Sequence, residues 1–267
     1  MKKKRLIPLV LYKDGYVIQS RAFSVHRSIG LLDATLRRLD DWRADEVILI
    51  DISSPDSTKG PSGRLDTASK FSETFLDAVK TQSHYGSMPL TIGGGITSMT
   101  QVENLFLSGA DKILLGSAIF ENPQLVTKIA EEYGSQSIVF SLDYMESNEK
   151  RVVCYASAQR IVQPDLQQVL DMACSLGVGE IMLHAVSRDG SKQGMDVSVL
   201  DEITEPKVPI IVCGGAGSPA HMVAMLSSNK LDAVAAGNYF HHVESSVQVA
   251  RSALLAAGLP VRRIGAL

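Results

Sequence analysis

Eight short apolar runs alternate with eight amphipathic stretches along the 267-residue chain, and this alternation constrains the fold more than any other feature. Most runs are continuously apolar, which is typical of parallel strands covered on both faces. The predicted strands are residues 6–11, 46–50, 90–92, 112–115, 137–142, 180–183, 210–213 and 233–236. The predicted helices are residues 31–43, 67–80, 99–108, 123–133, 165–176, 197–203, 219–226 and 245–256. The pattern favours one closed (βα)₈ barrel, a fold that typically needs roughly 250 residues.

The second half of the sequence repeats the first. Gly93-Gly94-Gly95 corresponds to Gly214-Gly215-Ala216, 121 positions later. Earlier pairs lie about a dozen residues further apart, with Leu11 matching Asp143 and Asp51 matching His184. The chain therefore reads as two half-barrels of four βα units each, with the length difference placed in loops. No interdomain linker stands out, so we expect residues 1–267 to form a single domain.

Composition narrows the class of protein. The chain is 45% hydrophobic and 21% charged, and its net charge of −3 gives no indication of nucleic-acid binding. Cys154, Cys174 and Cys213 share no metal-ligand spacing, so we expect thiols in a reducing cytoplasm and no metal or other cofactor. The apolar run at residues 6–12 is too short for a signal peptide, and no run reaches the length of a membrane span. We therefore expect a cytoplasmic protein without membrane or nucleic-acid partners.

Two glycine-rich turns are the strongest local signal. They follow the third and seventh predicted strands, and the neighbouring fourth and eighth strands also end in small residues. Backbone N–H groups in such turns are unobstructed and suit phosphate oxygens. One such turn could serve only as a tight connection, but the duplicated pair favours two phosphate sites. The candidates are Gly94, Gly95, Gly116 and Ser117 on one side and Gly214, Gly215, Ala236 and Gly237 on the other.

Two carboxylates end predicted strands. Asp51 ends the second and Asp143 the fifth, where barrel enzymes build their active sites. Either could act in acid–base catalysis, and either could instead hold a loop. The polar loop at residues 187–194, with Asp189 and Gly190, could close over a phosphate or be an ordinary solvated loop. His184 ends the sixth strand and could face the site, but a lone histidine is more often a packed polar group.

Charged residues begin four of the predicted strands, at the opposite end of the barrel. Arg5, Glu46, Lys112 and Glu180 are flanked by apolar residues. Two cations and two anions could form a mutually satisfied ring at this opening. Spacing alone favours the simpler interpretation, in which they are strand-end charges facing solvent.

In order along the whole chain, these segments resemble the cyclase subunit of imidazole glycerol phosphate synthase. The resemblance rests on Lys4-Arg5-Leu6-Ile7-Pro8, Lys13-Asp14-Gly15, Leu49-Ile50-Asp51-Ile52, Gly93-Gly94-Gly95-Ile96, Gly109-Ala110-Asp111-Lys112, Glu121-Asn122-Pro123, Gly179-Glu180-Ile181, Arg188-Asp189-Gly190 and Gly214-Gly215-Ala216-Gly217. The resemblance implies that a glutaminase subunit docks at the N-terminal face of the barrel. Its ammonia would pass through the interior to a bis-phosphate substrate at the mouth.

Individual roles follow from the same resemblance. Arg5, Glu46, Lys112 and Glu180 would gate the ammonia entrance, and Asp111 would face the glutaminase. The phosphate sites would be Gly95, Gly116 and Ser117 on one side and Gly190, Gly215, Ala236 and Gly237 on the other. Asp143 would be the second of two catalytic aspartates, whereas Asp51 and Asp189 are candidates from their positions alone.

Four positions depart from the family pattern. Leu11 stands where the first catalytic aspartate is expected, and Gln19 replaces a lysine, Gly116 an asparagine and Ser187 an acid. These departures suggest a paralogue that receives ammonia without closing an imidazole ring. Divergent members resemble proteins that work with a glutaminase and a third, sugar-modifying amidotransferase in surface-polysaccharide synthesis.

Three alternatives stay open at this point. The chain could be an authentic histidine-pathway cyclase. It could be a non-catalytic phosphate-binding barrel that serves as ammonia conduit or scaffold. A phosphosugar isomerase of the sister family is the third.

Overall fold

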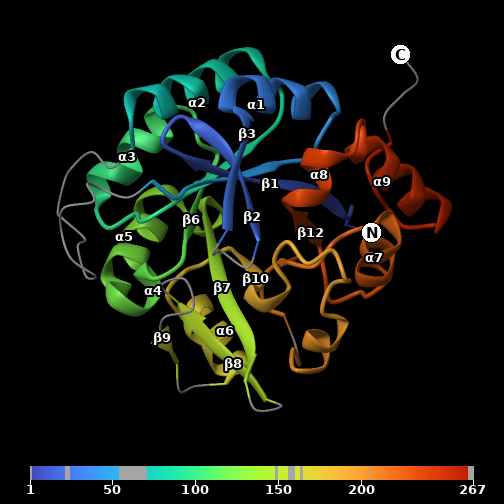
Figure 1. The fold of residues 1–267 in the computed structure, drawn as a ribbon. Helices are drawn as coiled ribbons and strands as arrows, with labels where there is room; N and C mark the ends of the chain where they lie inside the picture. The colour runs from blue at the N-terminus through green and yellow to red at the C-terminus, as the bar shows by residue number, and fades with distance from the viewer. Residues whose placement is uncertain are drawn as a thin grey trace.

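Parallel strands close into a barrel in the computed structural model, which describes residues 2–21, 25–53, 71–147, 150–155, 160–162, 165–204 and 206–263 (Figure 1). The barrel strands are β1 (Arg5–Lys13), β4 (Val47–Asp51), β5 (Leu90–Gly93), β6 (Lys112–Leu115), β7 (Ile138–Ser147), β10 (Glu180–Ala185), β11 (Ile210–Cys213) and β12 (Ala233–Ala236). The sheet has no open edge here, because β1 pairs in parallel with both β4 and β12, and β10 with both β7 and β11. The predicted (βα)₈ class is confirmed.

Helices surround the strands. The longer ones are α1 (Leu32–Asp41), α2 (Glu73–Tyr85), α3 (Met99–Leu107), α5 (Pro123–Tyr133), α6 (Leu166–Ser175), α7 (Pro219–Leu226) and α9 (Ser246–Ala256). Each of these helices overlaps one of the predicted amphipathic stretches. Helix α2 begins later than expected, because Ser72 caps it by accepting the Phe75 N–H. The start predicted for this helix at residue 67 lies outside the described residues. No helix in the described ranges is long and apolar enough to cross a membrane.

One predicted helix is wrong. Residues 197–203 form only a 3₁₀ turn, η3 (Val197–Asp201). The carboxylate of Asp196 precedes this turn but does not cap it. It accepts the Ser198 hydroxyl at 2.6 Å and the Arg151 guanidinium at 2.9 Å instead. Without a capped first turn, the segment stays short.

Several elements were not predicted. Antiparallel strands extend both β1 and β7: β2 (Tyr16–Arg21) and β3 (Val25–Leu31) follow the first, and β8 (Lys150–Tyr155) and β9 (Arg160–Ile161) follow the second. Short helices α4 (Ala118–Glu121) and α8 (Asn238–His242) follow β6 and β12. The remaining turns are η1 (Ser135–Ser137) and η2 (Val186–Arg188). Hairpins and short helices occur once in each half, which supports the two-half-barrel interpretation.

The strand registers correct the repeat by one residue. His184 pairs with Asp143 just as Ile50 pairs with Leu11, so His184 corresponds to Ile50 rather than to Asp51. Asp51 corresponds to Ala185, since they pair with Tyr12 and Tyr144. Successive residues of a strand face opposite sides, so this single step decides which side chains point into the barrel.

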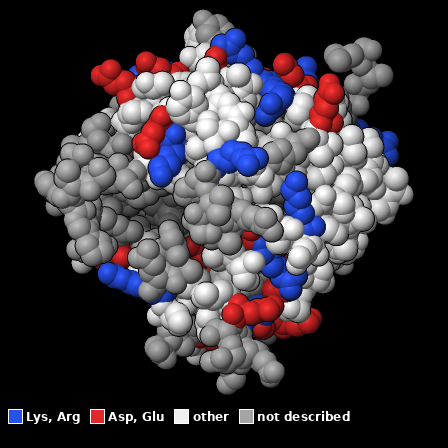
Figure 2. All heavy atoms as spheres, in the orientation of Figure 1, with Lys and Arg blue, Asp and Glu red and all other residues white. Residues whose placement is uncertain are grey.

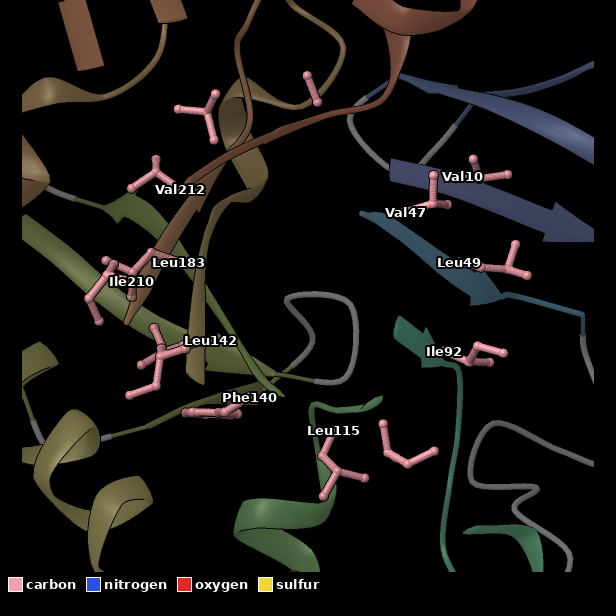
Figure 3. Close-up of a cluster of buried hydrophobic side chains, with 14 of the residues drawn as sticks. Val10, Val47, Leu49, Ile92, Leu115, Phe140, Leu142, Leu183, Ile210 and Val212 are labelled. Carbon is pink, nitrogen blue, oxygen red and sulfur yellow. The ribbon is translucent and has the colours of Figure 1, made fainter. Parts of the chain in front are cut away.

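Two apolar layers follow from this alternation. The larger lies between strands and helices and includes Val10, Leu49, Ile92, Phe140 and Leu183 (Figure 3). The smaller fills the barrel interior. Its fully or largely buried members are Ile7, Leu9, Leu11, Ile18, Ile48, Leu114, Val139, Met182, Ile211, Cys213, Ala233 and Ala235.

Candidate functional site

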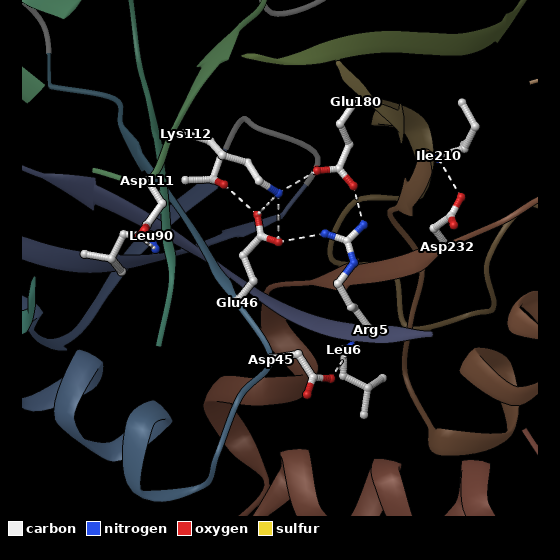
Figure 4. A network of polar contacts seen from close by, with 11 residues as sticks. Arg5, Leu6, Asp45, Glu46, Leu90, Asp111, Lys112, Glu180, Ile210 and Asp232 are labelled. Carbon is white, nitrogen blue, oxygen red and sulfur yellow. Dashed lines mark hydrogen bonds and ion pairs between the residues drawn. The ribbon is translucent and has the colours of Figure 1, made fainter. Parts of the chain in front are cut away.

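The four predicted gate residues meet at the floor of the barrel. The Arg5 guanidinium lies 2.8 Å from a Glu46 carboxylate oxygen and also pairs with Glu180 (Figure 4). The Lys112 ammonium lies 2.8 Å from Glu180 and 3.3 Å from Glu46. Glu46 and Glu180 are only 3% and 4% exposed. The four side chains form a closed ring, so the interpretation of solvent-facing charges that spacing favoured is wrong; the role as a gate stays a prediction.

Charge balance keeps the ring ionised. Burial by itself raises the pKa of Glu180, but hydrogen bonds and charges from Arg5 and Lys112 outweigh it and lower the pKa overall. Burial likewise opposes the charge on Arg5, yet Glu180 and Glu46 raise its pKa. Glu46 also accepts the Thr91 hydroxyl at 2.6 Å. Each buried oxygen charge therefore has a cation or donor beside it, as buried charges require.

Aspartates near the ring accept backbone N–H groups at the starts of barrel strands. Asp111 accepts from the Leu90 N–H at 2.8 Å, and its repeat equivalent Asp232 accepts from the Ile210 N–H at 3.2 Å (Figure 4). Asp45 does the same for Leu6 at 2.9 Å. Asp111 thus has a structural function, and its exposed position is compatible with the predicted role at a partner interface.

A cavity of about 410 Å³ opens at the other end of the barrel. It brings together Asp51, Asp143 and His184 with the first predicted phosphate group, Gly94, Gly95, Gly116 and Ser117. Its inner wall consists of Leu9, Leu114 and Met182, which belong to the interior apolar layer. The cavity therefore joins the mouth of the barrel to the interior above the charged ring.

Glycine is required in both predicted phosphate turns. Gly94 has a φ of +120°, and a Cβ there would lie 2.1 Å from the Asp51 carbonyl oxygen. Gly214 has a φ of +105°, and a Cβ there would lie 2.7 Å from the Ala185 carbonyl oxygen. Gly94 approaches Asp51 as Gly214 approaches Ala185, so the two glycines are equivalent in the two half-barrels. This agrees with the strand registers, in which Asp51 corresponds to Ala185.

The second predicted phosphate group does not share this cavity. Gly214, Gly215 and Ala236 are buried, whereas Gly95 is exposed. The loop after β10 lies against the turn, since the Gly194 N–H donates to the Gly215 carbonyl at 2.9 Å. None of Asp189, Gly190, Gly214, Gly215, Ala236 and Gly237 is among the residues that line the cavity. The first group, at Gly94 and Gly95, is thus open to the cavity, and the second, at Gly214 and Gly215, is covered by the loop after β10. Both phosphate-binding roles stay predictions.

His184 is the site residue that the sequence failed to single out. Its Nδ1 lies 3.1 Å from Asp143 Oδ1, and its side chain is 6% exposed. Burial lowers the pKa of His184, but the hydrogen bond and charge of Asp143, with the charge of Asp189, outweigh it and raise the pKa overall. Counting by two along β10 from the ring residue Glu180 reaches Met182 and then His184, and that inward alternation was the signal available.

Asp51 has a different environment. It is 2% exposed, and its Oδ1 accepts the Ser53 backbone N–H at 2.8 Å. It shares the outward strand face of Val47 and Leu49, although it still contributes to the cavity wall. Its carboxylate holds the turn after β4, and its predicted catalytic role stays untested.

Leu11 fills the inward position at the end of β1. It is 4% exposed and packs in the interior layer with Ile18 and Ile50. Gln19 is half-buried on β2, and Ser187 is exposed in η2. The mouth therefore carries a hydrocarbon side chain across the barrel from Asp143.

The rest of the mouth face is mixed in charge. Figure 2 shows lysines and arginines interspersed with aspartates and glutamates over the described atoms of this view. All three cysteines are free thiols, with Cys154 and Cys213 buried and Cys174 half-buried, as predicted.

Comparison with known proteins agrees with the geometry. A family model described as "Histidine biosynthesis protein" matches residues 5–246. Imidazole glycerol phosphate synthase subunit HisF of Chlorobium phaeovibrioides is 34% identical over 266 residues, covering 98% of this chain and 100% of the relative. The same subunit of Chlorobium phaeobacteroides is 32% identical over 263 residues, and that of Bacillus cereus 31% over 264, with the same coverage. The chain therefore belongs to the histidine biosynthesis protein family and is similar over nearly its full length to the cyclase subunit of imidazole glycerol phosphate synthase.

Proposed function

We propose that this chain is a synthase subunit that receives ammonia at the charged ring and delivers it to a phosphorylated substrate in the mouth cavity. The observation that carries the proposal is the alignment of three parts along one barrel. The ring of Arg5, Glu46, Lys112 and Glu180 forms the floor, and the apolar layer fills the middle. The cavity with Asp143 then opens above that layer.

Each part suits one stage of ammonia transfer. A glutaminase subunit at the N-terminal face would release ammonia beside the ring, where Asp111 is exposed. Neutral ammonia crosses an apolar interior at far lower cost than ammonium, because a bare charge is expensive to bury. Ala233 and Ala235 are small residues in that interior. The ring ion pairs must separate transiently for ammonia to enter.

The mouth would hold the phosphates of the substrate. Gly95 is exposed on the cavity wall beside Gly116 and Ser117, so its backbone can approach an anion. The second phosphate would lie under the loop at Asp189 and Gly190, which then has to open. Asp143 lies between these groups and the interior.

We further propose that ring closure to an imidazole has been lost. Leu11 removes one carboxylate from the mouth, and acid–base help of that kind is typically worth about 10²–10⁴ in rate. A surface-polysaccharide pathway fits this pattern, in which ammonia would build an amidine on a sugar with a third amidotransferase. An authentic histidine-pathway cyclase is the alternative.

A direct assay distinguishes a subunit that has lost ring closure from an authentic histidine-pathway cyclase. Purified protein is given ammonium chloride and the bis-phosphate substrate of the histidine pathway, and imidazole product is measured. We expect turnover far below that of ordinary enzymes. A rate of roughly 1–10³ per second would establish an authentic cyclase instead.

Leu11 also favours a second candidate, a non-catalytic barrel that only conducts ammonia. The variant Asp143→Asn discriminates. A pure conduit keeps supporting the ammonia-dependent activity of a partner amidotransferase after this change. A synthase subunit loses its own chemistry, whereas its glutaminase binding is unaffected.

A further inference from the structure

The inward faces of four strands, β1, β4, β7 and β10, carry the side chains compared at the mouth. Leu11 lies on β1 in the first half-barrel, and Asp143 occupies the equivalent inward position on β7 in the second. His184 on β10 pairs directly with Asp143 in the strand register. The first half has Leu11 beside Ile50, and the second has Asp143 beside His184. One half is thus apolar at this layer, and the other carries a hydrogen-bonded ionisable pair.

We propose that His184 and Asp143 form the proton-transfer pair of this site, with His184 as a catalytic acid and base in place of the carboxylate missing at Leu11. This inference rests on the proposed delivery of ammonia to a substrate in the cavity. It assigns the second acid–base group to a position adjacent to Asp143 rather than opposite it.

The geometry is that of an oriented histidine. His184 lines the cavity and is buried, so its ring is held by packing. The 3.1 Å contact of its Nδ1 with Asp143 fixes the proton of the neutral ring on that nitrogen. Exchange with the substrate then occurs at Nε2. Asp143 stabilises the imidazolium that forms when Nε2 takes up a proton.

The pair balances the chemistry of ammonia addition. The ammonia nitrogen gives its lone pair to an electrophilic carbonyl carbon, and the C=O π electrons move to oxygen. The adduct then carries a positive nitrogen and a negative oxygen. His184 takes one proton from the nitrogen at Nε2 and returns one to the oxygen, so a neutral carbinolamine forms and His184 is regenerated.

Neighbouring groups tune His184 toward this use. Asp143 faces it from β7 and Asp189 from the turn after η2, and both carboxylates favour the imidazolium. Cys213 faces it from β11. Burial, followed by the charges of Asp189 and Asp143, raises the pKa of Cys213, so this neighbour is a neutral thiol. Burial also raises the pKa of Cys154, which pairs with Asp143 from β8, to about 12.

The test uses His184→Asn in the full chain. The asparagine amide nitrogen takes the place of Nδ1 and keeps a hydrogen bond to Asp143, but it carries no transferable proton at neutral pH. His84→Gln, at an exposed position on α2, is the matched control. Incorporation of the ammonia nitrogen into the histidine-pathway bis-phosphate, with or without ring closure, is measured from ammonium chloride over a pH series by mass spectrometry.

We expect His184→Asn to lower kcat by about 10²–10⁴ while KM changes little. The wild-type pH profile should bend at the pKa of His184 that NMR titration gives. That bend should vanish in His184→Asn and move to lower pH in Asp143→Asn, which also serves if His184→Asn does not fold. His84→Gln should match the wild type.

Two failures are distinguishable. Measurable turnover that is equal in the wild type and His184→Asn, with the same pH profile, overturns this inference and leaves the proposed function standing. No incorporation of ammonia nitrogen in the wild type or any variant, although calorimetry shows that the bis-phosphate binds, overturns both.

Discussion

The floor and the mouth of this barrel use buried polar groups in opposite ways. At the floor, four charged side chains at the starts of β1, β4, β6 and β10 neutralise one another, and each contacts two of the others. At the mouth, one histidine–carboxylate pair stands opposite a leucine. Loss of one floor residue leaves an unbalanced charge next to two partners. Replacement of one residue at the mouth affects at most the single pair of His184 and Asp143.

This difference predicts that the two ends tolerate substitution unequally. A closed ring of alternating charges tolerates substitution poorly, because removal of one partner leaves the others buried and unpaired. At the mouth, by contrast, Leu11 carries no charge that a neighbour has to balance. Leu11 can therefore be replaced without leaving a buried partner unpaired, whereas Arg5, Glu46, Lys112 and Glu180 depend on one another.

The comparison predicts a large effect for Leu11→Asp. A carboxylate placed among Ile18 and Ile50 has an apolar environment, unlike Asp143 beside His184. We expect a loss of about 3 kcal/mol in unfolding free energy at pH 7, measured by urea denaturation. Burial raises the pKa of such a carboxyl, so the loss should shrink as pH falls and the group becomes neutral.

Leu11→Asn is the matched control, since it adds polarity without charge. Its destabilisation should not depend on pH between 4 and 7. A Leu11→Asp variant as stable as the wild type would show that the mouth is more polar than its packing indicates.

A somewhat smaller effect is expected at the floor from Glu180→Gln. The change keeps the shape but leaves Arg5 and Lys112 with only Glu46 for charge balance. We expect a loss of about 2 kcal/mol in unfolding free energy at neutral pH, because hydrogen bonds to charged groups are lost while both cations keep some access to water. Asp33→Asn, which breaks an exposed pair with Arg37 on α1, should leave the free energy of unfolding nearly unchanged, because water screens that pair.

The pH dependence of this variant has a definite sign. The pKa of Glu180 is lowered in the folded chain, so its contribution is present above the ordinary glutamate pKa of about 4.3 and is lost as pH falls through the lowered value. The stability gap between wild type and Glu180→Gln should therefore close in acid. A gap that persists below that range would mean that shape, not charge, holds the ring.

Much of the barrel was predictable, because strands that are buried on both faces appear in the sequence as continuously apolar runs. The continuously apolar runs located every barrel strand, and β11 and β12 have the predicted bounds. The hairpin strands β2 and β8 were missed because they continue β1 and β7 beyond the apolar runs. Only part of each strand is buried, namely Val17, Ile18 and Ser20 on β2 and Val153 and Cys154 on β8, so neither gives a long, continuously buried run.

The site was harder to predict, because it depends on register. Sequence distance matched Asp51 with His184, whereas the strand pairing matches Asp51 with Ala185. That error of one residue exchanges the inward and outward faces, so the importance of His184 was hidden. The ring was hidden for a related reason, since spacing does not show that Arg5 and Glu180 meet across the barrel.

The smallest effect separates partner binding from folding at the floor. Asp111 and Asp232 make the same hydrogen bond in the two half-barrels, to Leu90 and Ile210. Asp111→Ala and Asp232→Ala should each cost about 1 kcal/mol in unfolding free energy, the usual value of one hydrogen bond. If Asp111 also faces the glutaminase, only Asp111→Ala should weaken the complex, measured by calorimetry with the purified partner. Equal affinities for the two variants would mean that the glutaminase does not contact Asp111, and that this carboxylate serves only to anchor β5.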